Sequence, residues 1–156
     1  MIRAVTHADA DPVCALAVAT GLAPPDGTAE LAAVLAACLN GEQGPDHVWL
    51  ADDEGGLQAV AYVAPERLTD GTWNLYLIAV QPGAQNRGRG TALLRHVEEL
   101  LQARGARVLI VDTSGLPEFE RTRAFYRKCG YDEEARIRDY WKAGDDKIVF
   151  RKALAG

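Results

Sequence analysis

Two hydrophobic periods run along the chain, and each predicts a different kind of element. Apolar residues recur at the spacing of a helix face in several segments, and short apolar or alternating runs lie between them. The expected helices span about 11–21, 28–40, 89–104 and 118–129, and the expected strands span about 2–5, 47–51, 57–64, 73–80, 108–111, 131–138 and 147–152. The pattern therefore predicts an α/β chain with most of its length in regular structure.

Turn and cap residues fix the predicted order of these elements. Asp11, followed by Pro12, is the expected N-cap of the first helix, and Thr28 is the expected cap of the second. The run 52–56, with two acidic residues and two glycines, predicts a hairpin. The order is then β-α-α-β-β-β-α-β-α-β-β. The helix over 89–104 is a crossover that makes its flanking strands parallel, while the other pairs are expected to be antiparallel.

Composition and charge narrow the class of protein. The 156 residues suit a single domain spanning 1–156, with 48% hydrophobic and 25% charged residues. A net charge of -5 argues against nucleic-acid binding and mildly favours a cationic partner. No apolar run is long enough for a membrane span, so we expect a cytoplasmic protein. Cys14, Cys38 and Cys129 are widely spaced and read as reduced core thiols, with no metal site.

The loop from Val80 to Gly90 is the part of the sequence that carries chemistry. It joins a predicted strand to a predicted helix, and its glycines let a ligand approach the backbone N–H groups closely. These N–H groups and the dipole of the following helix favour an anion such as a diphosphate, to which Arg87 and Arg89 could add side-chain contacts. A tight turn with nothing bound is the alternative.

Two common diphosphate sites are disfavoured by the same loop. It lacks the Gly-Lys-Ser/Thr of a P-loop, and it lacks the third glycine and downstream acidic residue of a dinucleotide fold. A different diphosphate cofactor is therefore expected.

The sequence resembles the GCN5-related N-acetyltransferase (GNAT) superfamily. The resemblance rests on Gln85-Asn-Arg-Gly88-Arg-Gly90, which is similar to the family's pyrophosphate loop, and on Ala124-Phe-Tyr-Arg-Lys-Cys-Gly-Tyr131, which is similar to its second signature. It implies a mixed, mostly antiparallel central sheet of about six to seven strands, with helices on both faces and a splayed parallel pair at the centre. It also implies acetyl-CoA as co-substrate and no metal.

The resemblance further implies which residues hold the co-substrate. The expected pyrophosphate ligands are Gln85, Asn86, Arg87, Gly88, Arg89, Gly90 and Thr91, mainly through backbone amides. Backbone N–H groups near Ala79 and Val80 would hydrogen-bond the acetyl carbonyl and stabilise the charge that develops on its oxygen. The implied chemistry is direct attack by the amine without an acyl-enzyme.

Acid and base roles follow from the same resemblance. Tyr126 matches a tyrosine that many members place beside the CoA sulfur as general acid, although it could also simply pack on the sheet. Asn74 occupies the position where some members carry a glutamate base, and an amide cannot take up a proton. Asp112 is our first candidate for the base, with a loop-capping role through Thr113 or Ser114 as the alternative and a base acting through water as a further option.

The acceptor side is less constrained by the sequence. Asn74 and Tyr76 share one face of their strand and, with Asp112, are expected to line the acceptor pocket, while the run Arg138–Asp146 is either a loop that closes over it or a hairpin turn. The expected acceptor is a small-molecule amine or a peptide N-terminus. A CoA-binding sensor or interaction module without turnover, and a nucleotide-binding domain, are the alternatives. Monomer and homodimer stay open.

Overall fold

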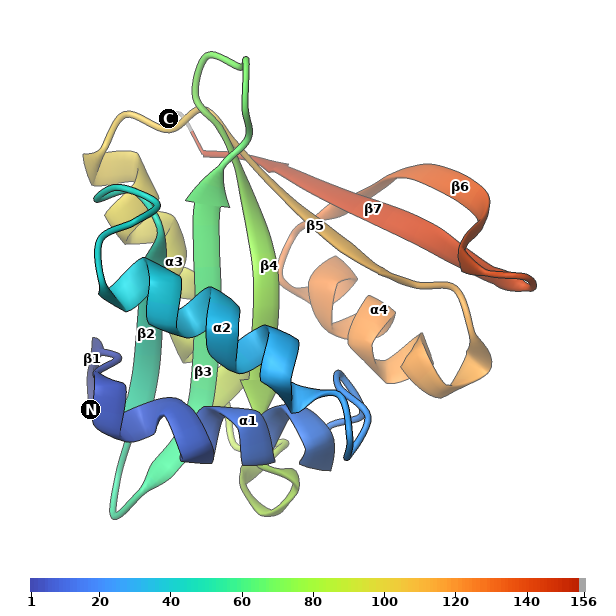
Figure 1. Ribbon diagram of the computed structural model, residues 1–156. Helices are drawn as coiled ribbons and strands as arrows, with labels where there is room; N and C mark the ends of the chain where they lie inside the picture. The colour runs from blue at the N-terminus through green and yellow to red at the C-terminus, as the bar shows by residue number, and fades with distance from the viewer. Residues whose placement is uncertain (155–156) are drawn as a thin grey trace. The chain divides into compact units, whose positions relative to one another are not determined.

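The computed structural model describes residues 1–154, which group into two compact units (Figure 1). The first unit comprises Met1–Ala64 and Leu77–Val97, and the second comprises Pro65–Tyr76 and the described chain from Glu98 onward. A seven-stranded sheet has the order β1-β2-β3-β4-β5-β7-β6. It is mixed: β4 and β5 are parallel, whereas the β1–β2, β2–β3, β5–β7 and β6–β7 pairs are antiparallel. The expected fold class is confirmed.

The first unit is built on an antiparallel set of strands with helices on both faces. Its elements are β1 (Ile2–Ala4), α1 (Ala10–Ala19), α2 (Thr28–Leu39), β2 (Val48–Asp53), β3 (Leu57–Pro65), the end of β4 (Thr72–Val80) and the start of α3 (Arg89–Ala103). α1 and α2 lie in front of β2 and β3 in Figure 1, and α3 lies behind them.

The side chains on both faces of β3 are buried. Val60, Tyr62 and Ala64 pack into one cluster with residues of α1 and α2. The intervening residues of β3 are also buried, at 1% exposure or less for Ala61 and Val63. A strand buried on both faces reads as a continuous apolar run rather than an alternating one, which matches this segment of the sequence.

The second unit contains the remaining elements. They are the start of β4, the end of α3, β5 (Val108–Ser114), α4 (Glu120–Lys128), β6 (Asp132–Lys142) and β7 (Asp145–Ala153). β4 and β5 pair only from Thr72 with Val108 to Leu75 with Val111, although both strands continue beyond these residues. The parallel pair therefore parts at Tyr76 and Asp112.

The strand register sorts the side chains of this unit onto two faces. Val111 lies opposite Leu75 on β4 and opposite Phe150 on β7, so these three side chains share a face. The next residue, Asp112, lies opposite Val149 and points to the other face. Because Tyr126 of α4 packs on Phe150 with ring centroids 5.5 Å apart, α4 covers the face of Leu75, Val111 and Phe150.

Several local expectations need correction. Asp11 does not cap α1, which begins one residue earlier, and Asp9 precedes it with no side-chain cap bond. Thr28 is the first helical residue of α2, with Gly27 in the cap position. Of the two readings of the run Arg138–Asp146, the structure shows the hairpin, because β6 continues to Lys142 and the antiparallel β7 begins at Asp145.

Candidate functional site

The predicted diphosphate loop lies in the first unit between β4 and α3. A short 3-10 turn at Pro82–Ala84 opens it, and the Gln85 amide donates to the Val80 carbonyl at 3.1 Å, which braces the loop across its base. Gly88 has a φ of +77°, a backbone conformation that residues other than glycine adopt only at a cost in free energy. A Cβ atom built at this position would meet no other atom within 4 Å. The space beside Gly88 is open.

Helix α3 begins directly after Gly88. Arg89, Gly90 and Thr91 form its first turn, and the Ala92 N–H donates to the Gly88 carbonyl at 2.9 Å. The first N–H groups of a helix have no acceptor within the helix, so this turn presents donors and the positive end of the helix dipole. The predicted role of this turn in binding a diphosphate depends on these donors and stays a prediction.

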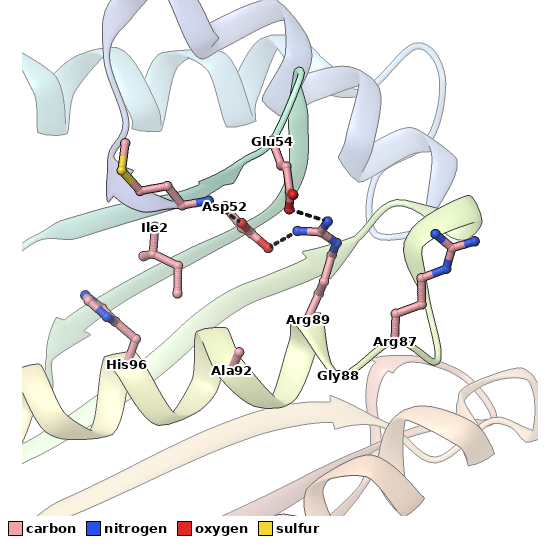
Figure 2. A pocket seen from close by; sticks show the side chains of 9 residues that line it. Ile2, Asp52, Glu54, Arg87, Gly88, Arg89, Ala92 and His96 are labelled. Carbon is pink, nitrogen blue, oxygen red and sulfur yellow. Dashed lines mark hydrogen bonds and ion pairs between the residues drawn. The ribbon is translucent and has the colours of Figure 1, made fainter.

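The side chain of Arg89 is held by acidic residues. It donates to Asp52 at 2.9 Å and to Glu54 at 2.6 Å, and Figure 2 shows it directed toward both carboxylates. These hydrogen bonds, first to Glu54 and then to Asp52, raise the pKa of the guanidinium. A phosphate contact from Arg89 is therefore expected from its backbone N–H rather than from its guanidinium.

An open pocket of about 550 Å³ borders this part of the first unit. Its lining includes Arg87 and Gly88 from the loop and His96 further along α3. Figure 2 shows Arg87 pointing away from the Arg89 ion pairs, and it is exposed with no ion-pair partner among residues 1–154. Of the two arginines in this loop, Arg87 is thus the one whose guanidinium forms no ion pair with the described residues.

Ala79 and Val80 lie at the end of β4 in the same unit. Ala79 is buried in the cluster that packs against α1 and α2, and the Val80 carbonyl accepts the bond from Gln85. Their predicted role toward an acetyl carbonyl depends on their N–H groups and stays a prediction.

Asn74 and Tyr76 meet at a carboxylate that sequence analysis missed. Glu66 follows directly after β3, and its Oε1 accepts a hydrogen bond from Asn74 Nδ2 at 2.8 Å and from the Tyr76 hydroxyl at 3.0 Å. Burial, together with the bond to Glu66 and its charge, raises the pKa of Tyr76 to about 12, so Tyr76 remains a donor at neutral pH. Glu66 carries no motif, and only the hairpin between β3 and β4 brings it to these side chains.

Asp112 lies on the same face as Asn74. Asn74 lies opposite Ile110 in the parallel pair, and Asp112 follows Ile110 by two residues on β5. One Asp112 oxygen forms an ion pair with Lys147 at 3.3 Å, and the other, Oδ1, is buried without a hydrogen-bond partner. The Asp112 charge also contributes to raising the pKa of Tyr76. The alternative reading, a cap by Asp112 through Thr113 or Ser114, is not observed, since one Asp112 oxygen pairs with Lys147, the other has no hydrogen-bond partner among the described residues, and Ser114 donates to Asp145.

Tyr126 is enclosed in an aromatic cluster on the opposite face. It is 3% exposed and packs against Phe150 and Tyr131, with ring centroids 5.5 and 5.9 Å away. Its hydroxyl has no hydrogen-bond partner among residues 1–154, and burial raises its pKa above the ordinary value. Tyr126 therefore carries a proton throughout the neutral range.

These placements put the predicted acid and the carboxylates on opposite faces of the second unit. Tyr126 is on the α4 face, whereas Asp112, Asn74 and Glu66 are on the other. A paired sheet separates its two faces, so groups on opposite sides can act on one bond only where the strands part. The β4–β5 pair parts at Tyr76 and Asp112.

Part of the C-terminal run also reaches the Asp112 face. Tyr140 on β6 lies over Lys147, with the Lys147 ammonium 4.4 Å from the ring centroid, and Tyr140 is half exposed. Trp141 donates from its indole to the Thr113 carbonyl at 3.3 Å. The run thus borders this face as strand and turn.

Within the described residues, no helix is both long and apolar enough to cross a bilayer. No group of three or more His, Cys, Asp or Glu residues in the range 1–154 is arranged to hold a metal ion. The three cysteines are all free thiols, with Cys38 and Cys129 buried.

Comparisons with known proteins identify similar chains. A family model described as the acetyltransferase (GNAT) domain matches residues 44–133. A mycothiol acetyltransferase from Beutenbergia cavernae is 33% identical over 87 residues, which are 56% of this chain and 29% of that protein, so the match spans less than a third of the relative's length.

Solved structures are similar over the whole chain. A protein from Desulfovibrio desulfuricans described as an acetyltransferase of the GNAT family has a TM-score of 0.89 and 31% identity, with 99% of each chain covered. An aminoglycoside 6'-N-acetyltransferase complexed with coenzyme A has a TM-score of 0.78 at 15% identity, with 100% of this chain and 98% of that chain covered.

Proposed function

Because this chain belongs to the GNAT family of acetyltransferases, we propose that it transfers the acetyl group of acetyl-CoA directly to an amine. The observation that carries the proposal is the placement of Tyr126 and the carboxylates on opposite faces, at the point where β4 and β5 part. Acetyl-CoA would supply an activated thioester there.

Residues of the first unit would bind the diphosphate of the co-substrate. The donors are the backbone N–H groups from Gln85 to Thr91, and the open space at Gly88 supports a close approach. Arg87 would add a charge-assisted contact because its guanidinium is exposed, whereas Arg89 braces the start of α3 against Asp52 and Glu54.

Residues of the second unit would handle the protons. Burial raises the pKa of Tyr126 and keeps its hydroxyl protonated at neutral pH, and this hydroxyl would donate its proton, as a hydrogen bond or completely, to the departing sulfur. On the other face, a carboxylate would take the proton that the acceptor ammonium must lose before its nitrogen can attack. Asp112 and Glu66 are the carboxylates available there.

We propose a small-molecule amine or a peptide N-terminus as acceptor. The acidic groups on the Asp112 face and the net charge of -5 support a cationic acceptor. Acetylation of an aminoglycoside by one structural neighbour is compatible with such a site. The alternative of a CoA-binding module without turnover rested on Asn74, and the carboxylate of Glu66 beside Asn74 weakens that argument.

A ligand panel followed by a turnover assay tests the proposal. Acetyl-CoA should raise Tm, while ATP and NAD should not, because only a ligand of the folded state stabilises it by mass action. CoA thiol should then be released with at least one of a diamine, an aminoglycoside or an alanine-initiated peptide. Stabilisation without thiol release from any amine would favour the binding module, and stabilisation by NAD or ATP would favour a nucleotide domain.

A further inference from the structure

We propose that Glu66, Asn74 and Asp112 form the binding site for an acceptor ammonium group and that Glu66 Oε2 takes its proton. This inference rests on the proposed acetyl transfer and names the residues that receive the amine. It replaces Asp112 with Glu66 as the proton acceptor.

Two buried oxygen atoms without partners define the site. Asn74 is 4% exposed, and its Oδ1 has no hydrogen bond among residues 1–154, as is also true of Asp112 Oδ1. A carboxylate only accepts hydrogen bonds, so Asn74 must turn its NH₂ group toward Glu66, which leaves Oδ1 directed elsewhere. Burying such an acceptor without a donor costs about 1–3 kcal/mol, a cost that a bound donor would remove.

An ammonium group has the donors that these acceptors lack. It carries three N–H groups and accepts nothing. Asn74 Oδ1, Asp112 Oδ1 and the Glu66 carboxylate supply three acceptor positions on one face of β4 and β5. The site lies beside the last paired residues of β4 and β5, Leu75 and Val111, so an amine held there is close to the point where the pairing of the two strands ends.

Glu66 is better placed than Asp112 to take and release a proton. Its Oε1 is fixed by the bonds from Asn74 and Tyr76, whereas Oε2 has no hydrogen-bond partner among the described residues. Glu66 is partly exposed, so a proton taken up there can pass to water. In Asp112, by contrast, one oxygen is paired with Lys147 and the other is fully buried.

The proton balance of the step is complete. The ammonium gives one proton to Glu66 Oε2, which passes it to solvent. The neutral nitrogen then bonds to the acetyl carbonyl carbon, the carbon–sulfur bond breaks, and the second proton lost by nitrogen is matched by the one gained by the CoA sulfur. The products are the acetamide, CoA thiol and one released proton.

Glu66→Gln tests the proton transfer because it keeps an Oε1 acceptor for Asn74 and Tyr76 while removing the carboxylate. We expect kcat to fall by about 10²- to 10⁴-fold, with the acetyl-CoA Kd and Tm unchanged. The acidic limb of the kcat/KM profile should disappear, even though Asp112 and Arg67, whose charges act on Tyr76, and Lys147, which pairs with Asp112, are all retained. Glu134→Gln on the exposed strand β6 is the matched control and should behave as wild type.

The results that would overturn the role of Glu66 differ from the result that would refute acetyl transfer by this protein. Wild-type turnover in Glu66→Gln would overturn the inference, and so would reduced turnover with the acidic limb intact, because another group would then take the proton. If Glu66→Gln does not fold, Glu66→Asp should keep the limb while losing part of kcat, and a lost limb there would contradict us. No thiol release by the wild-type protein would instead refute the proposed function.

A quaternary amine tests the three-acceptor site separately. The trimethylammonium counterpart of the best primary amine carries the same charge without N–H donors, so it should compete at least about tenfold more weakly, given the cost of leaving the buried acceptors unpaired. Equal competition by the two compounds would show recognition by charge alone and would overturn the assigned acceptors.

Discussion

The Tyr126 hydroxyl can be removed with little change to the protein around it. Tyr126→Phe deletes one oxygen from a side chain that is 3% exposed and keeps the ring contacts with Phe150 and Tyr131. Since the hydroxyl has no partner within residues 1–154, its loss leaves no other group unpaired. We expect Tm to be nearly unchanged, because the ring contacts are kept and no hydrogen bond to another described residue is lost.

The size of the kinetic effect depends on how far the proton moves. Burial raises the Tyr126 pKa, so the phenol is a weaker acid than usual, and complete transfer to a thiolate with a reference pKa near ~8.5 is disfavoured. Donation of a hydrogen bond to the developing charge is then the expected role. A hydrogen bond to a charged group contributes about 1.5–3 kcal/mol, which corresponds to a loss of about 10- to 150-fold in kcat.

Tyr131→Phe is the matched control in the same aromatic cluster. Its hydroxyl donates to Glu98 at 2.6 Å, and Glu98 also accepts from Lys152 at 3.0 Å. Removing this bond should cost about 1.5–3 kcal/mol and lower Tm by about 3–12 °C, while kcat stays at the wild-type value.

Steady-state kinetics, calorimetric acetyl-CoA binding and thermal unfolding of both variants complete the test. The two substitutions should give opposite patterns, with turnover lost in one and stability lost in the other. A Tyr126→Phe protein that loses less than about threefold in kcat would mean that Tyr126 only packs in the core, since a charged hydrogen bond contributes more than that. An unchanged kcat in Tyr126→Phe together with a reduced kcat in Tyr131→Phe would transfer the role to Tyr131.

Three further predictions concern other parts of the molecule. Gly90→Val should fold, because Gly90 is helical and outside the left-handed region, yet titration calorimetry should show acetyl-CoA binding about tenfold weaker or worse, and an unchanged affinity would refute the loop assignment. Asp112→Asn should raise the amine KM while the acidic limb of kcat/KM remains, whereas loss of that limb would return the base role to Asp112. The hydrogen bond from Arg3 lowers the pKa of Asp9 from 3.8 to about 2, so its stabilisation is present above about pH 4 and is lost as pH falls toward 2. Asp9→Asn should accordingly lower Tm at pH 7 and flatten the acid decline, and unfolding curves identical to wild type would contradict this.

Most of the helices and strands, and the backbone conformation of the loop at Gly88, could be predicted from the sequence, because these features depend on neighbours along the chain. Leu93, Leu94, Val97 and Leu101 repeat at helical spacing, and all four are fully buried on α3 as that spacing predicts. The glycine at position 88 likewise signals a backbone conformation that is a local property, and its φ of +77° agrees.

The pairing of charged side chains could not be predicted from the sequence and follows from the folded structure. Asp9 precedes α1 but bonds to Arg3 at 2.8 and 2.9 Å, and Arg89 is taken up by Asp52 and Glu54, more than thirty residues away along the chain. Asp9 also accepts from the Thr6 N–H at 2.8 Å, and the sequence pattern alone does not show which of these partners a carboxylate will have.

The difference between what the sequence and the structure show is clearest at the face that carries Asn74, Asp112 and Glu66. Asn74 and Asp112 could be read from the sequence, but Glu66 could not, because only the turn from β3 into β4 brings its carboxylate to Asn74 and Tyr76. The separation of Tyr126 from Asp112 onto opposite faces likewise follows from the register of β5 with β7, in which a shift of one residue would exchange the faces. Sequence fixes which groups are present, and strand pairing decides which of them face one another.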